Sequence, residues 1–355
     1  MYEFFYNLTG NVIISTFIVA VFPLLNVLVV VIVGVYLERK VSAHIQDRLG
    51  PMRTGWHGSL QLIADFIKLL QKEDIASNET DKPLFNLAPI LVFVGAFAAY
   101  AAIPFSSKLI GSEIEVGIFY VIAISGVVVI SILMAGWAAN NKYSLLGAMR
   151  SAAQIISYEI PTALVILSIV MLTGTLSLST MSEMQTAYFW NWNIFGGAGV
   201  GLSKFLLIPF MIIGFIIIYI STLAETNRTP FDIPEAESEL VAGYFTEYCG
   251  MKYAMFMLSE YGNMFAVSAI VSILFFGGYH SPFGYLGNSF DAQWLIPYEQ
   301  AFWFLFKSWI FILIQMWLRW TLPRLRVDQL MSLCWKYLIP YAFVNLIIIG
   351  IISLL

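Results

Sequence analysis

Long apolar runs recur along the chain, separated by shorter polar connections. A helix needs roughly 20 mainly apolar residues to cross the hydrocarbon core of a bilayer. Eight runs of that kind can be counted, near residues 13–37, 84–104, 117–139, 158–178, 204–223, 261–279, 300–320 and 336–355. The pattern therefore predicts an all-α integral membrane protein with eight transmembrane helices and both termini on the same side of the membrane.

The connection between the first two runs contains a different pattern. Over residues 59–72, six apolar residues recur at helical spacing, and Asp65, Lys68 and Lys72 follow one another on the opposite face. Such a two-faced segment is typical of an amphipathic helix that lies in the membrane interface. Just before it stand Glu38, Arg39 and Arg48, whose density of charge suggests the wall of a polar pocket. The alternative is a surface helix with solvated charges.

Composition supports the membrane class. Hydrophobic residues make up 59% of the 355 residues, charged residues 11%, and the mean hydropathy is +0.81, which excludes an ordinary soluble globular chain. The two cysteines and three histidines are scattered, so we expect no metal, haem or iron–sulfur site built by this chain alone. The N-terminal segment lacks a basic region and a cleavage site, which favours a retained first span. We expect one membrane domain over residues 1–355.

Basic residues predict the orientation. The odd-to-even connections hold 15 of the 18 lysines and arginines, and the other side holds only Lys108, Lys204 and Lys307. Because positive charge favours the cytoplasmic side, the large polar connections should lie inside and both termini outside. The length and charge layout favour a bacterial inner membrane, with a mitochondrial or plastid membrane as the alternative.

The connection between residues 223 and 261 is strongly acidic. Its seven carboxylates are Glu225, Asp232, Glu235, Glu237, Glu239, Glu247 and Glu260. Like charges held close together disfavour ionisation, so at least one member should keep a proton near neutral pH. The alternative is a solvated acidic loop. Apolar residues interleave the acids, which favours burial.

A further acid stands at the entrance of the fourth span. Arg150, Gln154 and Tyr158 recur every four residues and should share a helix face, and Glu159 follows directly. Pro161 cannot donate a backbone hydrogen bond, which leaves the Ser157 carbonyl without its helical partner. A carboxylate at such a disrupted entrance is a candidate for proton conduction, and the alternative is a glutamate partnered by Arg150 or by water.

Five segments in order along residues 38–336 read ERKVSAHIQDRLGP, ADFIKLLQKE, RSAAQIISYEI, AETNRTPFDIPEAESELVAGYFTEY and LPRLRVDQLMSLCWK. In these segments the chain resembles the membrane subunit of respiratory complex I that carries the quinone site. In bacteria this is the H subunit of NADH-quinone oxidoreductase, and in mitochondria it is subunit 1. The resemblance covers every inside connection and implies the same eight spans.

The resemblance implies a function. In this family the subunit anchors the peripheral redox arm, forms the membrane part of a quinone-access cavity, and couples quinone reduction to proton translocation. NADH, FMN and the iron–sulfur clusters belong to partner subunits, so the quinone, ubiquinone or menaquinone, would be the substrate and this chain alone would bind no cofactor. The implied partners are the peripheral-arm quinone-site subunits, the antiporter-like membrane subunits and the lipid bilayer, without nucleic acid.

The resemblance also implies two sets of site residues. Those of the quinone cavity would be Glu38, Arg39, Arg48, Asp65, Arg228, Arg319, Arg324, Arg326 and Asp328. For Arg324 and Arg326, anchoring against lipid headgroups is an equal alternative. Those of the proton and coupling pathway would be Glu159, Glu225, Asp232, Glu235, Glu237, Glu239, Glu247 and Glu260, and we hypothesise that Glu235, Glu237 and Glu239 form its coupled cluster.

Two other functions stay open at this point. A related membrane protein occurs in ferredoxin-dependent and hydrogenase-type complexes, but the intact ERK, ETNRTPFD and DQLM motifs favour a quinone enzyme. A free-standing secondary transporter would also carry intramembrane carboxylates. The absence of an inverted repeat and the concentration of charge on one side disfavour a transporter.

Overall fold

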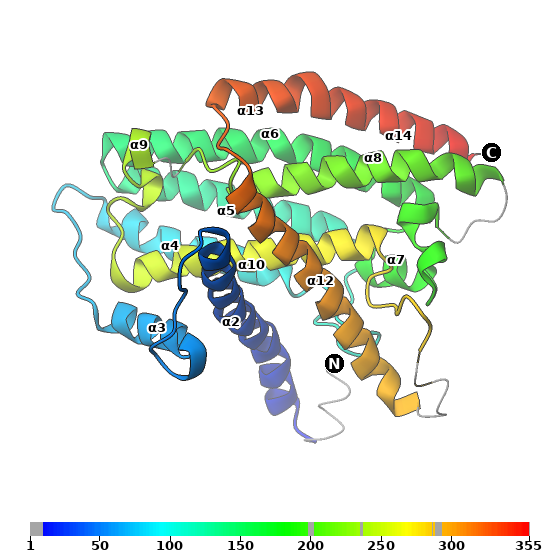
Figure 1. The fold of residues 1–355 in the computed structure, drawn as a ribbon, viewed down its shortest axis with the longest axis horizontal. Helices are drawn as coiled ribbons and strands as arrows, with labels where there is room; N and C mark the ends of the chain where they lie inside the picture. Colours follow the sequence, from blue (N-terminus) through cyan, green and yellow to red (C-terminus); the bar gives the residue numbers. More distant parts are fainter. Residues whose placement is uncertain (1–9, 198–201, 235–236, 286, 288–292, 355) are drawn as a thin grey trace.

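The computed structural model describes residues 10–197, 202–234, 237–285, 287 and 293–354, and in them the protein is all-helical (Figure 1). The sole β-type pairing within those residues is an isolated bridge between Pro104 and Ile110. Within the described residues, the long helices are α2 (Val12–Ile45), α4 (Lys82–Ala99), α5 (Gly117–Ala138), α6 (Lys142–Thr173), α8 (Leu202–Glu225), α10 (Gly250–Phe275), α12 (Ile296–Thr321) and α14 (Ile339–Ser353).

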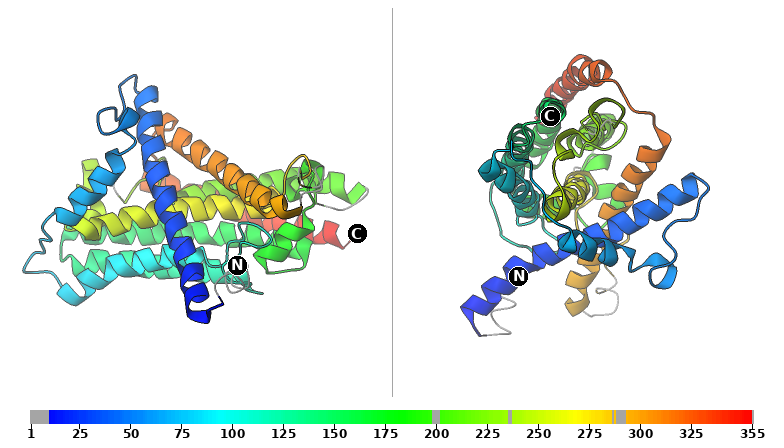
Figure 2. Two further views of the ribbon diagram at one scale, coloured as in Figure 1. Left: turned by 90° about the horizontal axis from the view of Figure 1, so that it is seen from below. Right: turned by 90° about the vertical axis from the view of Figure 1, so that its left-hand side faces the viewer.

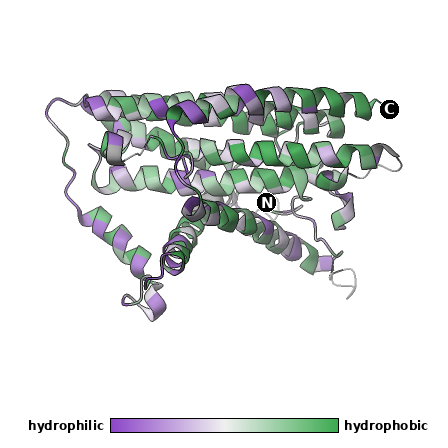
Figure 3. Cartoon of the chain, turned by 45° about the horizontal axis from the view of Figure 1, so that its top comes forward, coloured by the Kyte–Doolittle hydropathy of each residue, from purple (hydrophilic) through white to green (hydrophobic). Residues whose placement is uncertain are grey.

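Seven helical segments of the described chain are long and apolar enough to cross a membrane. They cover Lys82–Ala99, Gly117–Ala138, Lys142–Thr173, Lys204–Glu225, Gly250–Phe275, Gln293–Thr321 and Val327–Ser353. Figure 3 shows these helices as mostly hydrophobic, with hydrophilic residues gathered at one end of the bundle and in the adjoining loops. The chain is therefore a multi-pass membrane protein. Helix α2, which has 34 residues, includes the first predicted span, residues 13–37, but it is not among these seven segments, so the eighth span stays a prediction.

The helices form two sets. Helices α4, α5, α6, α8, α10 and α14 lie roughly side by side, and α2 and α12 cross them obliquely (Figures 1 and 2). Helix α10 packs against α2, α4, α8 and α12, and 78% of its most apolar stretch is buried. Side chains attached to α10 are therefore surrounded by protein, whereas those on the outer helices also face the hydrocarbon.

The short elements lie at the ends of the bundle. They include α3 (Gln61–Gln71), α7 (Leu178–Met184), α9 (Glu237–Leu240) and α13 (Val327–Leu333), and a five-residue π-helical turn, Cys334–Leu338, joins α13 to α14. No residue of α3 is buried, and Ile63, Phe66, Ile67 and Leu70 are exposed on it. This matches the amphipathic helix predicted over residues 59–72.

Some helices begin well before the apolar run that predicted them. Helix α6 starts at Lys142, where the Asn141 side chain caps it by accepting a hydrogen bond from the Tyr143 backbone. Pro161 lies inside α6 without ending it. Helix α10 likewise starts at Gly250 rather than near residue 261. Glu260 consequently stands on a helix instead of in a loop, and Arg150 lies on the same helix as Glu159, as its spacing predicted.

Candidate functional site

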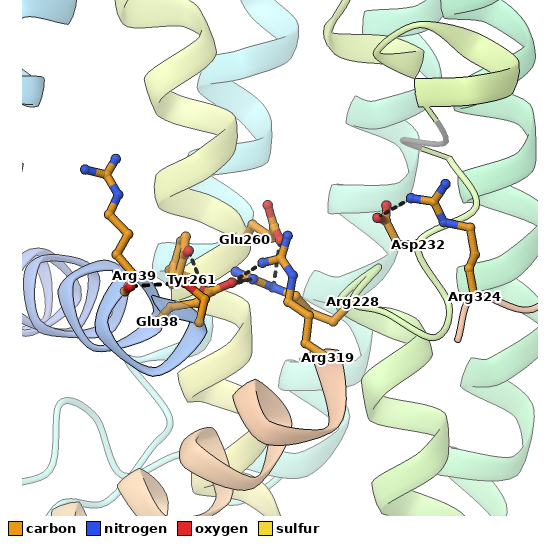
Figure 4. Close-up of polar contacts among 9 residues, drawn as sticks. Glu38, Arg39, Arg228, Asp232, Glu260, Tyr261, Arg319 and Arg324 are labelled. Atoms are coloured by element: carbon orange, nitrogen blue, oxygen red, sulfur yellow. Dashed lines mark hydrogen bonds and ion pairs between the residues drawn. The ribbon is translucent and has the colours of Figure 1, made fainter. Parts of the chain in front are cut away.

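Four charged side chains from four distant parts of the chain meet beside α10. We call them the arginine cluster: Glu38 of α2, Arg228 of the loop after α8, Glu260 of α10 and Arg319 of α12 (Figure 4). Arg228 Nη1 donates to both carboxylate oxygens of Glu38, at 2.9 and 3.0 Å. Arg228 Nε lies 2.8 Å from Glu260 Oε1, and Arg319 Nη1 also donates to Glu38.

The arginine cluster is largely enclosed by protein, and its two arginines balance its two glutamates in formal charge. The side chains of Arg228 and Glu38 are 3% and 7% exposed. Burial alone would lower the pKa of Arg228, but the neighbouring Glu260 and Glu38 carboxylates raise that pKa well above its ordinary range. Tyr261 completes the shell, since its hydroxyl donates to Glu38 at 2.6 Å and its ring lies 4.5 Å from the Arg228 guanidinium carbon. The Arg228 charge is therefore permanent.

A network of amide groups holds the loop that carries Arg228. Gln154 of α6 donates from Nε2 to Ala224 O, to Asn227 Oδ1 and to Phe231 O, at 2.8, 3.1 and 2.9 Å. Asn227, whose backbone has the left-handed φ of 50° that asparagine tolerates, donates in turn to Ser151 Oγ. These buried hydrogen bonds tie the loop to α6 and so support the orientation of Arg228 towards Glu38 and Glu260.

Two further ion pairs flank the arginine cluster. Arg39 Nη1 donates to Asp65 Oδ2 at 2.6 Å and so ties α2 to α3, while Arg324 Nη2 donates to Asp232 Oδ2 at 2.8 Å. Burial raises the pKa of Asp232, and Arg324 partly offsets that rise. The Leu325 backbone also donates to Pro230 O. The segment before α13 is therefore attached to the same loop as Arg228.

A cavity of about 100 Å³ lies between α5, α6, α8 and α10. Its walls are mainly apolar, but Glu159 and Glu225 both line it. Glu159 accepts from Ser125 Oγ at 2.9 Å, and Glu225 accepts from Thr162 Oγ1 at 2.8 Å. The described residues form no ion pair with either carboxylate.

A second cavity, of about 30 Å³, is lined by both Glu225 and Glu260. Glu260 belongs to the arginine cluster, and Glu225 belongs to the larger cavity. Three carboxylates, Glu260, Glu225 and Glu159, therefore follow one another from the arginine cluster through two adjoining cavities to the side of α6. Carboxylates arranged in this way can pass protons from one to the next through intervening water.

The NADH dehydrogenase family model matches residues 17–350. The chain is 51% identical to the H subunit of NADH-quinone oxidoreductase from Chlorobaculum tepidum, over 94% of this chain and 91% of that protein. It is 46% identical to the H subunit from Brevibacillus brevis and 44% identical to an H subunit from Cytophaga hutchinsonii, each over 94% of this chain. The chain belongs to the family of NADH-quinone oxidoreductase H subunits. The resemblance seen in its five segments is confirmed, and so is its interpretation as part of an enzyme complex.

The structure brings together only part of the residues predicted for the quinone cavity of an H subunit. Glu38, Arg228 and Arg319 meet in the arginine cluster, and Arg39, Asp65 and Arg324 lie beside it in the flanking ion pairs. Arg48, Arg326 and Asp328 are exposed and form no ion pair within the described residues. Arg48 donates instead to Gln46.

The residues predicted for the proton pathway also separate into groups. Glu260 and Asp232 pair with arginines, and Glu159 and Glu225 face the larger cavity. Glu247 accepts from Asn141 Nδ2 at 2.8 Å, at the start of α6. Glu239 is 59% exposed and pairs with Arg150 at 2.6 Å, so Arg150 is the partner of Glu239 and not of Glu159. Glu235 and the side chain of Glu237 lie outside the described residues.

Several residues of the site were missed from the sequence. Tyr261 directly follows Glu260, and Asn263 lines both cavities, yet neither stood out within an apolar run. Cys334 was also missed: its thiol donates to the Ser157 carbonyl that Pro161 leaves without a helical partner, at 3.0 Å. In the sequence, only the position of Pro161 indicated that the Ser157 carbonyl needs a hydrogen-bond donor from outside its own helix. Within the described residues, no group of histidine, cysteine and acidic side chains could hold a metal ion.

Proposed function

We propose that this chain forms the membrane part of the quinone-access cavity of a proton-pumping NADH:quinone oxidoreductase and couples quinone reduction to proton translocation. The observation that carries the proposal is the continuity between the arginine cluster and the two cavities. The side chain of Glu260 pairs with the permanently charged Arg228, and it also lines the smaller cavity together with Glu225.

The arginine cluster suits a cavity that receives a quinone. A quinone that takes up electrons ahead of protons gains negative charge, and buried guanidinium groups stabilise such charge in a low-dielectric environment. Arg228 and Arg319 already share Glu38, so added negative charge nearby would compete for them. The redox centres themselves would be supplied by partner subunits.

Coupling follows from that competition. When a reduced quinone draws on the arginines, Glu260 loses part of its compensation and its affinity for a proton rises. The change would reach Glu225 and then Glu159, because each consecutive pair shares a cavity. We also propose that Glu235, Glu237 and Glu239 take part as a coupled cluster; replacing all three by glutamine should then abolish pumping, and wild-type proton stoichiometry in that variant would refute this part.

The assembly and its membrane complete the proposal. We propose one membrane domain with eight spans, in which α2 is the first, and with both termini on the outer side of a bacterial inner membrane. The inside face would then carry the arginine cluster, α3 and the acidic connection, where peripheral-arm subunits dock. Antiporter-like subunits would dock beside α6 and receive protons from Glu159, which lines the larger cavity.

The proposal is tested with the whole complex, purified by a tag on this chain. We expect NADH-driven quinone reduction that quinone-site inhibitors block, and a photoreactive quinone analogue should label α2, residues 226–234 or α12. Pre-incubation with inhibitor is the control, since it should remove the label. Hydrogen or ferredoxin chemistry, or labelling confined to α5 and α14, would contradict the proposal.

A further inference from the structure

Two hydroxyl groups line the larger cavity beside its carboxylates, and each has two acceptors within hydrogen-bond distance. Thr162 Oγ1 on α6 lies 2.8 Å from Glu225 Oε1 on α8, and 2.9 Å from the carbonyl oxygen four residues before it in its own helix. Ser125 Oγ on α5 lies 2.9 Å from Glu159 Oε1 on α6, and 2.6 Å from the carbonyl oxygen three residues before it. The same arrangement therefore occurs twice around one cavity.

Each of these hydroxyl groups has one hydrogen for its two acceptors. Thr162 therefore cannot donate to Glu225 and to the carbonyl at the same time. If Thr162 donates to the carbonyl, its contact of 2.8 Å with Glu225 requires that Glu225 carries a proton and donates it to Thr162. If Glu225 is ionised, Thr162 must donate to the carboxylate instead. The direction of the hydroxyl is thus set by the proton on its partner, and the same holds for Ser125 and Glu159.

The two acceptors differ in how much they need the hydroxyl. In an α-helix a backbone carbonyl also accepts from the N–H group four residues further on, so the hydroxyl is its second donor. The carboxylates have no such substitute, because the described residues form no ion pair with Glu159 or Glu225. An ionised carboxylate enclosed by protein is costly unless it accepts hydrogen bonds. The hydroxyl can therefore leave the carbonyl when the carboxylate becomes charged.

Other serines of the same helices provide a comparison. Ser131 Oγ on α5 donates to the Val127 carbonyl at 2.6 Å, and Ser168 Oγ on α6 donates to the Val165 carbonyl at 2.6 Å. Both serines are buried, and within the described part of the chain neither lines the cavity or has a hydrogen bond to a carboxylate. The backbone contact is thus shared with serines elsewhere in the bundle, and the second contact with a carboxylate is what sets the two cavity hydroxyls apart.

We propose that Thr162 and Ser125 are positioning residues, each of which holds its carboxylate partner in both protonation states by turning its single hydrogen. When the proton of Glu225 leaves for water in the cavity, the negative charge stays on Glu225 and the Thr162 hydrogen turns from the carbonyl to the carboxylate. When a proton returns, the hydrogen turns back, and Thr162 keeps it throughout. A cavity of about 100 Å³ has room for the water. The inference rests on the proposed function, because the turning hydrogen matters where these carboxylates exchange protons.

The test uses variants of the whole complex in proteoliposomes, with proton uptake and NADH oxidation measured together. Thr162→Val keeps the shape of the side chain and removes the hydroxyl, so ionised Glu225 loses its donor. The rate of proton uptake should fall by about tenfold, the factor by which one hydrogen bond to a charged group shifts an equilibrium. Thr162→Ser, which keeps the hydroxyl, should match the unaltered complex. Ser168→Ala, which removes a hydroxyl of the same helix, is the matched control and should have no effect.

A double variant separates a role through the carboxylate from a purely structural one. If Thr162 acts through Glu225, adding Thr162→Val to Glu225→Gln should cause no further loss of proton uptake. A further loss, or unaltered proton uptake in Thr162→Val alone, would overturn the proposal. If Thr162→Val does not assemble, Ser125→Ala decides the question, with Ser131→Ala as its control. Unaltered uptake in Ser125→Ala would then overturn the proposal.

The same measurements distinguish this inference from the proposed function. Reduced proton uptake in Glu225→Gln together with unaltered uptake in Thr162→Val would overturn the role of the hydroxyl alone. Unaltered uptake in Glu225→Gln would overturn both, because the carboxylate itself would then lie outside the proton pathway.

Discussion

In the arginine cluster each carboxylate pairs with a guanidinium group, whereas in the cavity between α5, α6, α8 and α10 the carboxylates accept hydrogen bonds from hydroxyl groups and form no ion pair within the described residues. Glu38 contacts Arg228, Arg319 and Tyr261, and Glu260 contacts Arg228. Glu225 and Glu159 instead accept from Thr162 and Ser125. Both regions lie within the same helical bundle and adjoin at Glu260.

The difference determines what each region can do. An arginine partner favours the charged form of a buried carboxylate, because protonation would leave the guanidinium unpaired. A hydroxyl can donate to a carboxylate and accept from a carboxylic acid, so Thr162 and Ser125 suit either protonation state. On the proposed function, the pairing of Arg228 and Arg319 with Glu38 holds charge in place, the carboxylates bonded to hydroxyl groups exchange protons, and Glu260, which adjoins both regions, links them. The predictions that follow test this contrast in order of expected effect.

The largest effect is expected from removing the shared cation. Arg228→Gln would leave Glu38 with Arg319 as its one cationic partner beside the Tyr261 hydroxyl, and Glu260 without its arginine. The cost should be roughly 3–5 kcal/mol, since a buried ion pair that loses one member is strongly destabilised. The assembled complex should be scarce in native gels, with a lower Tm than the unaltered complex. Arg48→Gln, which removes an exposed arginine, is the control. Normal assembly and Tm in Arg228→Gln would show that the cluster does not depend on its central charge.

A loss of proton pumping is expected when a carboxylate of the cavity between α5, α6, α8 and α10 is replaced. Glu225→Gln fills the same space but cannot take up a proton, so protons pumped per electron should fall while the complex still assembles. The measurement is proton uptake and NADH oxidation in the same proteoliposomes. Glu225→Asp keeps an ionisable group and serves as the control. Unchanged stoichiometry in Glu225→Gln would remove this carboxylate from the pathway.

A smaller effect is expected at Asp232, which combines burial with an arginine partner. Burial raises its pKa and Arg324 lowers it, so Arg324→Gln should raise the pKa further and leave less ionised Asp232 at any given pH. If ionised Asp232 is needed, the acid limb of the pH profile of quinone reduction should move to higher pH. Arg326→Gln, two residues away and exposed, should leave the profile unchanged. An acid limb that stays in place in Arg324→Gln would remove the Asp232 charge from the reaction.

The smallest effect is expected at the exposed edge of the site. Arg39 is 44% exposed and Asp65 is 21% exposed, so their ion pair is screened by water and salt. Arg39→Gln should destabilise the complex by roughly 0.2–1 kcal/mol, the range for exposed pairs. Its Tm is compared with that of Arg228→Gln under one salt concentration. Equal losses of Tm in the two variants would contradict the contrast between paired charges inside and outside the bundle.

Much of the fold was predictable because bilayer spans leave a direct mark on sequence. Apolar runs of about 20 residues located the long helices, and the alternation of apolar and charged residues located α3. Helix starts were less predictable, as α6 and α10 show, because a capped helix continues into polar sequence without an apolar signal. The four-residue spacing of Arg150, Gln154 and Tyr158 correctly predicted that they lie on one helix. It did not predict which residues they contact.

Sequence alone determined the membrane class, the order of the spans and, through five segments that resemble the quinone-site membrane protein of complex I, the family. Local periodicity and motif order carry that information without knowledge of any distant contact. The tertiary structure decided which charges meet. Glu38 and Arg228 lie 190 residues apart in the chain, and Arg319 lies a further stretch away, yet all three converge beside α10. Only packing determines whether a carboxylate faces a guanidinium or a hydroxyl, and on the proposed function that difference separates fixed charges from exchangeable ones.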